Sequence, residues 1–349
     1  MTQNERIGGD FRWGIWGTDM IASSFAADIA ASAGMRVVAV CSHTTQTAQA
    51  FCRHIGINKA FGNPHAFLAD PEIDAVYIAS PNMLHVEQAL DAIMAGKACL
   101  IEKPLSLDPE GARQIETASK ARNIFAMEAM WTRFLPAVQA VKHAIDASRI
   151  GTVTHIEADL SYSRAYDPES RFFSPALGGG AAFDLGVYPL SLALYFLGLP
   201  EKVDGHCQRA ASGVDLRSEF NLGWPSATAW ISCGFDRDGE NRMSIEGTDG
   251  AILIHPPFLK AQRLTFFSRS ALHSPFGPKN SKGRIGNIIN RLPLPGRTIE
   301  THAFAGNGLQ FQAQAVRDAI RRGEISTPIM PLAQSAAVAD IISRVLVSG

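Results

Sequence analysis

The sequence lacks the patterns by which several classes of protein are recognised. Its five cysteines include no CxxC pair or other metal-ligand spacing, and its ten histidines include no HExxH pattern. An odd, scattered set of cysteines favours reduced thiols over a disulfide framework. Lys and Arg number 32 against 33 Asp and Glu, for a net charge of −1. We therefore expect no metal site, and no electrostatic attraction to nucleic acid or to an anionic membrane.

Long hydrophobic runs are also absent. Residues 1–13 are polar and contain no apolar segment of a secretory signal. The most apolar stretch, 187–199, is interrupted by Pro189 and is shorter than the roughly 20 residues that cross a bilayer. Hydrophobic residues make up 46% of the chain and charged residues 19%, as in globular proteins. The sequence therefore predicts a cytoplasmic protein that does not bind membranes.

A chain of 349 residues exceeds one ordinary core and predicts two domains. In the first, from residue 10 to 130, strand and helix patterns alternate. Strands are expected at 11–16, 35–41, 75–79, 98–101 and 124–127, and helices at 17–33, 45–55, 85–94 and from 109 onward. This alternation is typical of an α/β domain with a doubly wound parallel sheet.

Residues 131–349 follow a different pattern. After a predicted helix at 136–147, few helices separate the strand-like stretches at 153–161, 202–209, 226–235 and 251–255. This pattern predicts an α+β domain with an open, largely antiparallel sheet, and a final helix that is free to pack back on the first domain. Segment 270–299 carries five Lys or Arg residues and no acid. We expect a solvated loop there, with an anion-binding flap as the alternative.

A glycine turn follows the first predicted strand, with the sequence Gly17-Thr18-Asp19-Met20-Ile21-Ala22. It is the G-x-G-x-x-A form of the Rossmann dinucleotide fingerprint, with Asp19 in place of the middle glycine. Gly17 permits a tight turn, and Ala22 permits close packing of helix on strand. The Asp19 carboxylate can accept from the N–H groups of the first helical turn, which a pyrophosphate would also use. Asp19 is therefore either turned aside to solvent, which we favour, or a competitor for the cofactor.

Nucleotide preference is expected to depend on the end of the second predicted strand, Cys41-Ser42-His43-Thr44-Thr45. An acid at this point would hold the ribose 2′-hydroxyl of NAD. Hydroxyls and an imidazole accommodate a 2′-phosphate better than a carboxylate would. The sequence therefore favours NADP, although no arginine is present and NAD remains the alternative.

A lysine follows the apolar run 98–101, in Glu102-Lys103-Pro104. This position is the carboxyl edge of the predicted parallel sheet, where open α/β sheets bind ligands. A desolvated lysine is readily tuned for chemistry. The alternative is a surface lysine that happens to follow a strand.

The second predicted domain contains a triple glycine, Gly178-Gly179-Gly180, followed by a helix pattern. Asp184 and Tyr188 are four residues apart and are expected on one face of this helix. Pro189 removes the backbone bond to Leu185 and should kink the helix at Tyr188. Among apolar neighbours, both polar side chains should be semi-buried and partnered. The alternative is an Asp–Tyr packing pair beneath a loop.

Together these motifs resemble the glucose–fructose oxidoreductase and inositol dehydrogenase (Gfo/Idh/MocA) family. Further matching pieces are the run Tyr77–Asn82 with His85, and Gly96-Lys97 ahead of Glu102-Lys103-Pro104. Tyr188, where many members have histidine, and the run 127–134 are similar to one branch. That branch contains dimeric dihydrodiol dehydrogenases, NADP-dependent D-xylose 1-dehydrogenases and glucose–fructose oxidoreductase. Gln312 departs from the family, in which an acid is common at this position.

The resemblance implies a role for each candidate residue. Lys103 and Tyr188 are expected at the nicotinamide and Asp184 at the substrate, with a cis bond before Pro104. The implied cofactor-binding residues are Gly17, Thr18, Asp19, Met20, Ile21, Ser42, His43, Ser80, Pro81, Asn82, His85, Glu102 and Lys103. The implied substrate residues are Lys103, Trp131, Arg133, Phe134, Asp184 and Tyr188. As aromatics, Trp131 and Phe134 are alternatively plain core.

The predicted function is that of an NADP-preferring dehydrogenase or reductase acting on the CH–OH group of a sugar or cyclic diol. Tyr188 would exchange the hydroxyl proton, and the ammonium of Lys103 would favour the phenolate and stabilise alkoxide character. A homodimer through the second-domain sheet is expected, because an open sheet otherwise exposes an apolar face. The alternative function is a non-catalytic dinucleotide-binding sensor, like a yeast galactose-regulon repressor of the same fold.

Overall fold

The chain forms two compact units. The computed structural model describes residues 9–348, apart from 273, 275–276 and 279–282. The first unit holds the described residues up to Trp131 together with Ala305–Ala336. The second holds Thr132–Phe304 and the described residues from Ala337 onward.

Within the described residues, the first unit contains a six-stranded parallel sheet. Its strands are β1 (Phe11–Trp16), β2 (Met35–Cys41), β3 (Ala60–Phe61), β4 (Ala75–Ile78), β5 (Ala98–Glu102) and β6 (Ala126–Ala129). They are ordered β3-β2-β1-β4-β5-β6, and every neighbouring pair is parallel. The predicted doubly wound α/β sheet is therefore confirmed, and its strand order reverses between β1 and β4.

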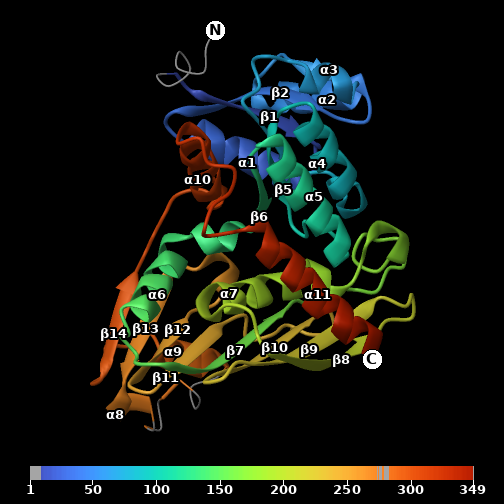
Figure 1. Ribbon diagram of the computed structural model, residues 1–349. Helices are drawn as coiled ribbons and strands as arrows, with labels where there is room; N and C mark the ends of the chain where they lie inside the picture. Colours follow the sequence, from blue (N-terminus) through green and yellow to red (C-terminus); the bar gives the residue numbers. More distant parts are fainter. Residues whose placement is uncertain (1–8, 273, 275–276, 279–282, 349) are drawn as a thin grey trace. The chain divides into compact units, whose positions relative to one another are not determined.

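Helices cover both faces of this sheet, as Figure 1 shows with α1 and α10 on one side and α4 and α5 on the other. The helices are α1 (Met20–Ala30), α2 (Thr45–Ile55), α3 (Pro64–Leu68), α4 (His85–Met94), α5 (Pro109–Arg122) and α10 (Leu309–Arg321). Alternate side chains of β1 point to opposite faces. Trp13 packs edge-on against Phe25 of α1, with ring centroids 5.3 Å apart, while Trp16 packs against Phe67 of α3 at 6.1 Å. The parallel sheet is thus buried on both faces.

Helix α10 belongs to the first unit, although the sequence analysis placed all of 131–349 in the second domain. The buried carboxylate of Asp28, on α1, accepts hydrogen bonds from the backbone N–H groups of Asn307 (2.9 Å) and Leu309 (2.9 Å). These bonds hold the start of α10 against α1. The last helix, α11 (Leu332–Ser348), begins in the first unit and ends in the second.

As far as the structure describes it, the second unit contains an eight-stranded sheet. Its strands are β7 (Val153–Ser161), β8 (Lys202–Arg209), β9 (Asp215–Gly223), β10 (Thr228–Gly234), β11 (Met243–Gly247), β12 (Gly250–Ile254), β13 (Arg263–Ser268) and β14 (Arg297–Thr301). They are ordered β14-β13-β12-β11-β7-β10-β9-β8, and all neighbours are antiparallel except β7 and β10. The predicted open, largely antiparallel sheet is confirmed. Helices α6 (Pro136–Asp146) and α7 (Val187–Leu197) lie on one face (Figure 1).

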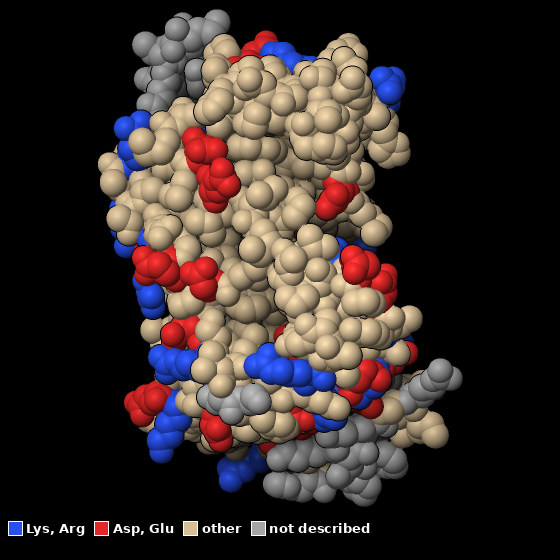
Figure 2. All heavy atoms as spheres, turned by 90° about the vertical axis from the view of Figure 1, so that its right-hand side faces the viewer, with Lys and Arg blue, Asp and Glu red and all other residues tan. Residues whose placement is uncertain are grey.

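The other face of this sheet is polar near its middle. A homodimer was predicted because this face was expected to be apolar, and that reason does not hold near the middle of the sheet. In β7 the buried Ile156 and Leu160 face the helices, and the partly exposed Glu157 and Asp159 alternate with them. Asp159 accepts from Arg237 at 3.0 Å. An apolar part of the same face, around Leu253, is packed by α8 (Arg269–Leu272). On the side of the molecule drawn in Figure 2, Lys and Arg are interspersed with Asp and Glu.

The basic segment 270–299 was expected to be a loop, but part of it is helix and strand. It contains α9 (Gly283–Ile289) and the start of β14 as well as part of α8. Residues 273, 275–276 and 279–282 of this segment lie outside the described residues. These short elements were not predicted, because the many Pro and Gly residues of the segment are typical of turns and loops.

One helical stretch, Pro175–Leu197, is long and apolar enough to cross a membrane by length and composition, which the sequence analysis excluded for 187–199. In the fold, 83% of its most apolar window is buried inside the protein. Burial of this kind is also found in core helices.

Candidate functional site

The turn after β1 requires glycine. Gly17 has a φ of +123°, which side-chain-bearing residues rarely adopt. A Cβ atom on Gly17 would lie 2.1 Å from the carbonyl oxygen of Ala79, at the end of β4. The Gly17 N–H donates to the Cys41 carbonyl at 2.9 Å, which ties the turn to β2. Gly17 thus allows the backbone to pass between the carboxyl ends of two neighbouring strands.

Asp19 is turned aside, as the sequence analysis favoured. It occupies the position just before α1, in an extended conformation, and its exposed side chain makes no capping hydrogen bond to the helix. The carboxylate therefore does not occupy the N–H groups of the first turn. A helix N-terminus in this state favours an anion.

A cavity of about 450 Å³ opens beside this turn. Seven of the predicted cofactor residues line it: Gly17, Thr18, Asp19, Ser42, His43, Ser80 and Pro81. Six others do not: Met20, Ile21, Asn82, His85, Glu102 and Lys103. The remaining lining residues, which the sequence analysis missed, are Trp16, Gly62, Pro64, Ala79, Leu84, Glu87, Gln88 and Asp91. Its size is that of a small-molecule site, about 300–1,000 Å³.

The cavity wall combines apolar and polar residues, and it carries more negative than positive charge. Its lining includes the exposed carboxylates Asp19, Glu87 and Asp91, and contains no Lys or Arg. The sequence did not identify Glu87 and Asp91 as lining residues. They lie on α4, where acidic residues on the exposed face are ordinary for a helix. Exposed carboxylates act weakly on a ligand because water and salt screen them.

Hydroxyls gather at the end of β2. Ser42 Oγ lies 3.4 Å from Thr18 Oγ1 and 3.4 Å from His43 Nδ1. Thr44 caps α2 by accepting from the Thr47 N–H at 3.1 Å. The structure therefore brings together the side chains that the sequence analysis assigned to the nucleotide ribose.

Glu102, beside Lys103, is a buried acid. Its carboxylate accepts from the Tyr77 hydroxyl and, at 3.1 Å, from the Lys103 backbone N–H. Burial raises the pKa of Glu102 to about 7, against the opposing effects of the Tyr77 hydrogen bond and the Lys103 charge. The Lys103–Pro104 bond is cis, as the family resemblance implied. Glu102 thus fixes the backbone that carries Lys103.

His85 is also a supporting residue. Its side chain is fully buried, with Nδ1 2.8 Å from the Pro104 carbonyl and Nε2 2.9 Å from the Ser80 carbonyl. Burial lowers the pKa of His85. The imidazole therefore links the loops after β4 and β5 and has no surface with which to touch a cofactor.

In the second unit, the triple glycine is followed by a π-helical turn, η5 (Ala182–Gly186), and then by α7. Gly180 has a φ of +127°, and a Cβ there would lie 2.3 Å from Asp215 Oδ1. Asp215 is buried and accepts from the Ala182 N–H at 2.8 Å and from the Ser218 hydroxyl at 2.7 Å. Burial raises the pKa of Asp215. Sequence reasoning missed this residue because it lies on β9, far along the chain.

The helix changes type where a kink was predicted, and its backbone stays helical through Gly186 and Val187. Pro189 lies within the first turn of α7, directly after the π-helical turn. The change of helix type at Gly186–Val187 lies between Asp184 and Tyr188. Asp184 is partly exposed and lies 4.0 Å from Arg171, while Tyr188 is 6% exposed.

Two predicted substrate residues are core, which corrects that assignment. Arg133 has no exposed surface, and its guanidinium donates to Ser191 Oγ (2.8 Å) and to the Ser191 carbonyl (2.6 Å). Phe134 is buried as well. Arg133 therefore anchors α7 through Ser191. Its charge had suggested contact with a substrate, whereas its partners belong to the protein core. Trp131 is partly buried and belongs to the first unit.

Two family descriptions match the chain. One reads "Oxidoreductase family, NAD-binding Rossmann fold" and matches residues 11–129. The other reads "GFO/IDH/MocA C-terminal domain" and matches residues 138–253. The first match spans the parallel sheet, and the second spans β7 to β11 and most of β12 in the second sheet.

Relatives cover nearly the whole chain. It is 29% identical over 339 residues to trans-1,2-dihydrobenzene-1,2-diol dehydrogenase of Sus scrofa, covering 96% of this chain and 95% of the relative. It is 31% identical over 319 residues to the protein of that name from Oryctolagus cuniculus, covering 89% of each. A solved structure, aldose-aldose oxidoreductase from Caulobacter crescentus complexed with glycerol, matches with a TM-score of 0.81 at 21% identity over 96% of each chain. This last likeness shows the fold.

Proposed function

Because this chain belongs to the GFO/IDH/MocA oxidoreductase family, we propose that it transfers hydride between a nicotinamide dinucleotide and the carbinol carbon of a sugar or cyclic diol. The observation that carries the proposal is the cavity at the Gly17 turn, beside the uncapped first turn of α1. The substrate class rests on the relatives, which are dihydrodiol dehydrogenases and share about 30% of their residues with this chain over most of its length.

The residues of this cavity fit a dinucleotide. The first turn of α1 offers N–H groups for a pyrophosphate, because Asp19 does not use them. Ser42, His43 and the start of α2 would receive the ribose and, in NADP, its 2′-phosphate. When bound, the nicotinamide supplies the site that accepts or donates hydride. We propose NADP as the preferred form, since no acid follows β2.

Tyr188 is proposed as the acid and base, as an expectation from the family. Its phenolate would accept the substrate hydroxyl proton in oxidation, and its phenol would return a proton in reduction. The Lys103 ammonium would stabilise negative charge on the substrate oxygen. Asp184 would orient a neighbouring hydroxyl. The proposal requires Lys103 and Tyr188 to act on one substrate.

The test of this proposal is Tyr188→Phe. We expect turnover to fall by roughly 10²–10⁴-fold, the size of a general acid–base contribution, with NADPH binding unchanged by fluorescence titration. Tyr195→Phe is the matched control, since Tyr195 lies on the same helix and bonds Gln139. Lys103→Met should be as damaging, and Lys120→Met, on an exposed turn of α5, should not be. Normal turnover by Tyr188→Phe on a screen of pentoses, hexoses, inositols and diols would refute the proton-transfer role.

A second candidate function is a dinucleotide sensor without turnover. This candidate follows from Asp19, which lines the cavity and replaces the middle glycine of the dinucleotide fingerprint. Tight NADPH binding with no turnover on the same screen would support the sensor. Turnover of any of these substrates would support the enzyme.

Assembly as a homodimer through the eight-stranded sheet stays a proposal, as does a cytoplasmic location. The open face of that sheet carries paired charges such as Asp159 and Arg237, so a dimer there would have a polar interface. Sedimentation as a monomer would refute it.

A further inference from the structure

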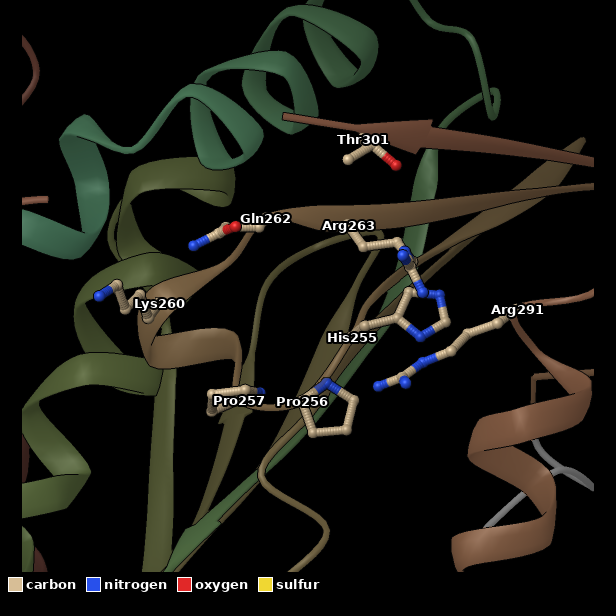
Figure 3. Close-up of a pocket in the computed structure, with 8 residues that line it drawn as sticks. All are labelled: His255, Pro256, Pro257, Lys260, Gln262, Arg263, Arg291 and Thr301. Atoms are coloured by element: carbon tan, nitrogen blue, oxygen red, sulfur yellow. The ribbon is translucent and has the colours of Figure 1, made fainter. Parts of the chain in front are cut away.

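A second pocket lies wholly within the second unit and plays no part in the proposed function. It has a volume of about 420 Å³ and lies where β12 ends, β13 begins and β14 ends. Its lining residues, drawn in Figure 3, are His255, Pro256, Pro257, Lys260, Gln262, Arg263, Arg291 and Thr301. A volume of this size holds a small metabolite.

The pocket is positively charged. Lys260, Arg263 and Arg291 line it, and none of its eight lining residues is acidic. Figure 3 shows the His255 ring between Arg263 and Arg291, with Lys260 apart from them at the other side of the pocket. Two guanidinium groups in one pocket without an acidic lining residue repel one another, and a bound anion relieves that repulsion.

His255 is the buried polar group of this pocket. It is 3% exposed, and its Nε2 lies 2.8 Å from Thr265 Oγ1. The Thr265 hydroxyl donates its single proton to the Asn290 carbonyl at 2.9 Å, so it must accept from Nε2–H. Burial, Arg291 and Arg263 lower the pKa of His255 to about 4. The ring is therefore neutral at pH 7, with an unprotonated Nδ1.

That Nδ1 atom is buried and has no hydrogen-bond partner. A buried acceptor without a donor is destabilising unless a ligand or water satisfies it. A ligand that fits this pocket therefore carries negative charge for the cations and an O–H group for Nδ1. A phosphoryl group meets both needs, since it offers three acceptor oxygens and, as a monoester or free phosphate, an O–H on phosphorus or on its carbon skeleton.

We infer that this pocket binds a phosphoryl anion, either inorganic phosphate or the phosphate monoester of a small polyol. Arg263 and Arg291 neutralise the phosphoryl oxygens, Lys260 adds positive charge at the other side of the pocket, and His255 Nδ1 accepts from a ligand hydroxyl. The site goes beyond the proposed function, because none of its residues belongs to the cavity at Gly17 or to the Asp184–Tyr188 segment.

The test is calorimetric titration of the full-length protein, saturated with NADPH so that the first cavity is occupied. Inorganic phosphate, glucose 6-phosphate, glucose and acetate are the probes. Wild type is compared with Arg291→Gln and Arg263→Gln. Arg36→Gln, which removes the same group from an exposed position on β2, is the matched control. A parallel NMR titration follows the His255 ring, so that a variant that fails to fold does not decide the result.

We expect saturable binding of phosphate or glucose 6-phosphate that weakens roughly tenfold or more in Arg291→Gln and Arg263→Gln, as for a lost charge-assisted hydrogen bond. Binding to Arg36→Gln should match wild type, and the His255 resonances should shift on titration. Tighter binding of glucose 6-phosphate than of phosphate identifies a monoester, and equal binding identifies free phosphate. The inference is overturned by the absence of saturable binding, by equal affinity in all variants, by a stationary His255 signal, or by acetate binding more tightly than phosphate. NADPH affinity of Arg291→Gln should stay at the wild-type value, which separates this result from the proposed function.

Discussion

At the scale of single residues, Gln312 on α10 is in an unfavourable position. Its side chain is fully buried, and neither its Nε2 nor its Oε1 has a hydrogen-bond partner. Leaving both groups unpaired costs free energy, about 1–3 kcal/mol per buried group in protein data. From the sequence we could say only that Gln312 stands where the family commonly has an acid, and no effect on stability could be inferred.

Gln312→Met is therefore expected to stabilise the protein, by about 1–2 kcal/mol, because it removes two unpaired groups at similar volume. Urea unfolding at pH 7 measures the change. The same substitution at Gln310 is the control, since that amide accepts from Gly308 and donates to the Ala305 carbonyl, and should lower stability. A loss of stability in Gln312→Met would mean that the amide is satisfied by bound water.

Asp19 sets the charge at the start of α1. Because its carboxylate lies at the cavity without bonding the helix, it repels an anionic cofactor and contributes no cap. Asp19→Gly should tighten NADPH binding by roughly two- to fivefold, from about 0.5–1 kcal/mol of removed repulsion. Fluorescence titration measures it, with Asp91→Asn as a lining carboxylate on α4 for comparison. Weaker binding in Asp19→Gly would show that the carboxylate organises the turn.

At the scale of elements, the strand-to-helix turn at Gly17 is the most constrained feature of the first unit. Gly17→Ala should destabilise the protein by more than about 2 kcal/mol, because the new Cβ meets the Ala79 carbonyl and the φ is unfavourable. Gly56→Ala is the matched control. It also has a positive φ, of +76°, but its Cβ would meet nothing within 4 Å, so about 1 kcal/mol is expected. Thermal unfolding compares the two, and similar losses would contradict a steric role for Gly17.

Elements with local signals were predictable from sequence. The bounds of β1, β2, α2 and α4 agree with the expected ranges, because buried strands were marked by apolar runs and helix ends by glycines such as Gly56. Strand β9, Asp215–Gly223, was missed, since its polar residues give no apolar run. Its pairing with β8 and β10 is decided by neighbours distant in sequence.

The candidate site was predictable to a similar degree. Gly17, Ser42 and Ser80 line the cavity because they end strands of a parallel sheet, which motif and topology both indicate. Arg133 and His85 were misassigned, because a charged or polar residue beside a motif gives no sign of whether it faces a ligand or a carbonyl. Asp215 and Asp28 act on backbone N–H groups that no local pattern connects to them.

At the scale of the whole molecule, Glu102 makes stability depend on pH. The fold holds the pKa of Glu102 at about 7, above the ordinary 4.5. The folded state thus keeps a proton that the unfolded chain releases, and the free energy of unfolding falls as pH rises from about 4.5 to 7. The full effect is at most about 3 kcal/mol.

Glu102→Gln should remove this dependence. The difference in melting temperature, variant minus wild type, is expected to increase between pH 5 and pH 8, whatever its sign at pH 5. Glu110→Gln, on the exposed first turn of α5, should show a constant difference. A constant difference for Glu102→Gln as well would mean that the carboxylate is ionised throughout this range.

The hydrogen bonds from Asn307 and Leu309 to Asp28 have a consequence for biosynthesis. The nucleotide-binding sheet is complete by residue 129, yet a helix that packs beside α1 is encoded after residue 305. A ribosome must therefore translate the whole eight-stranded sheet of the second unit before that surface receives its cover. Until then α1 lacks the helix that covers it, and we expect chaperones to bind this flank during synthesis.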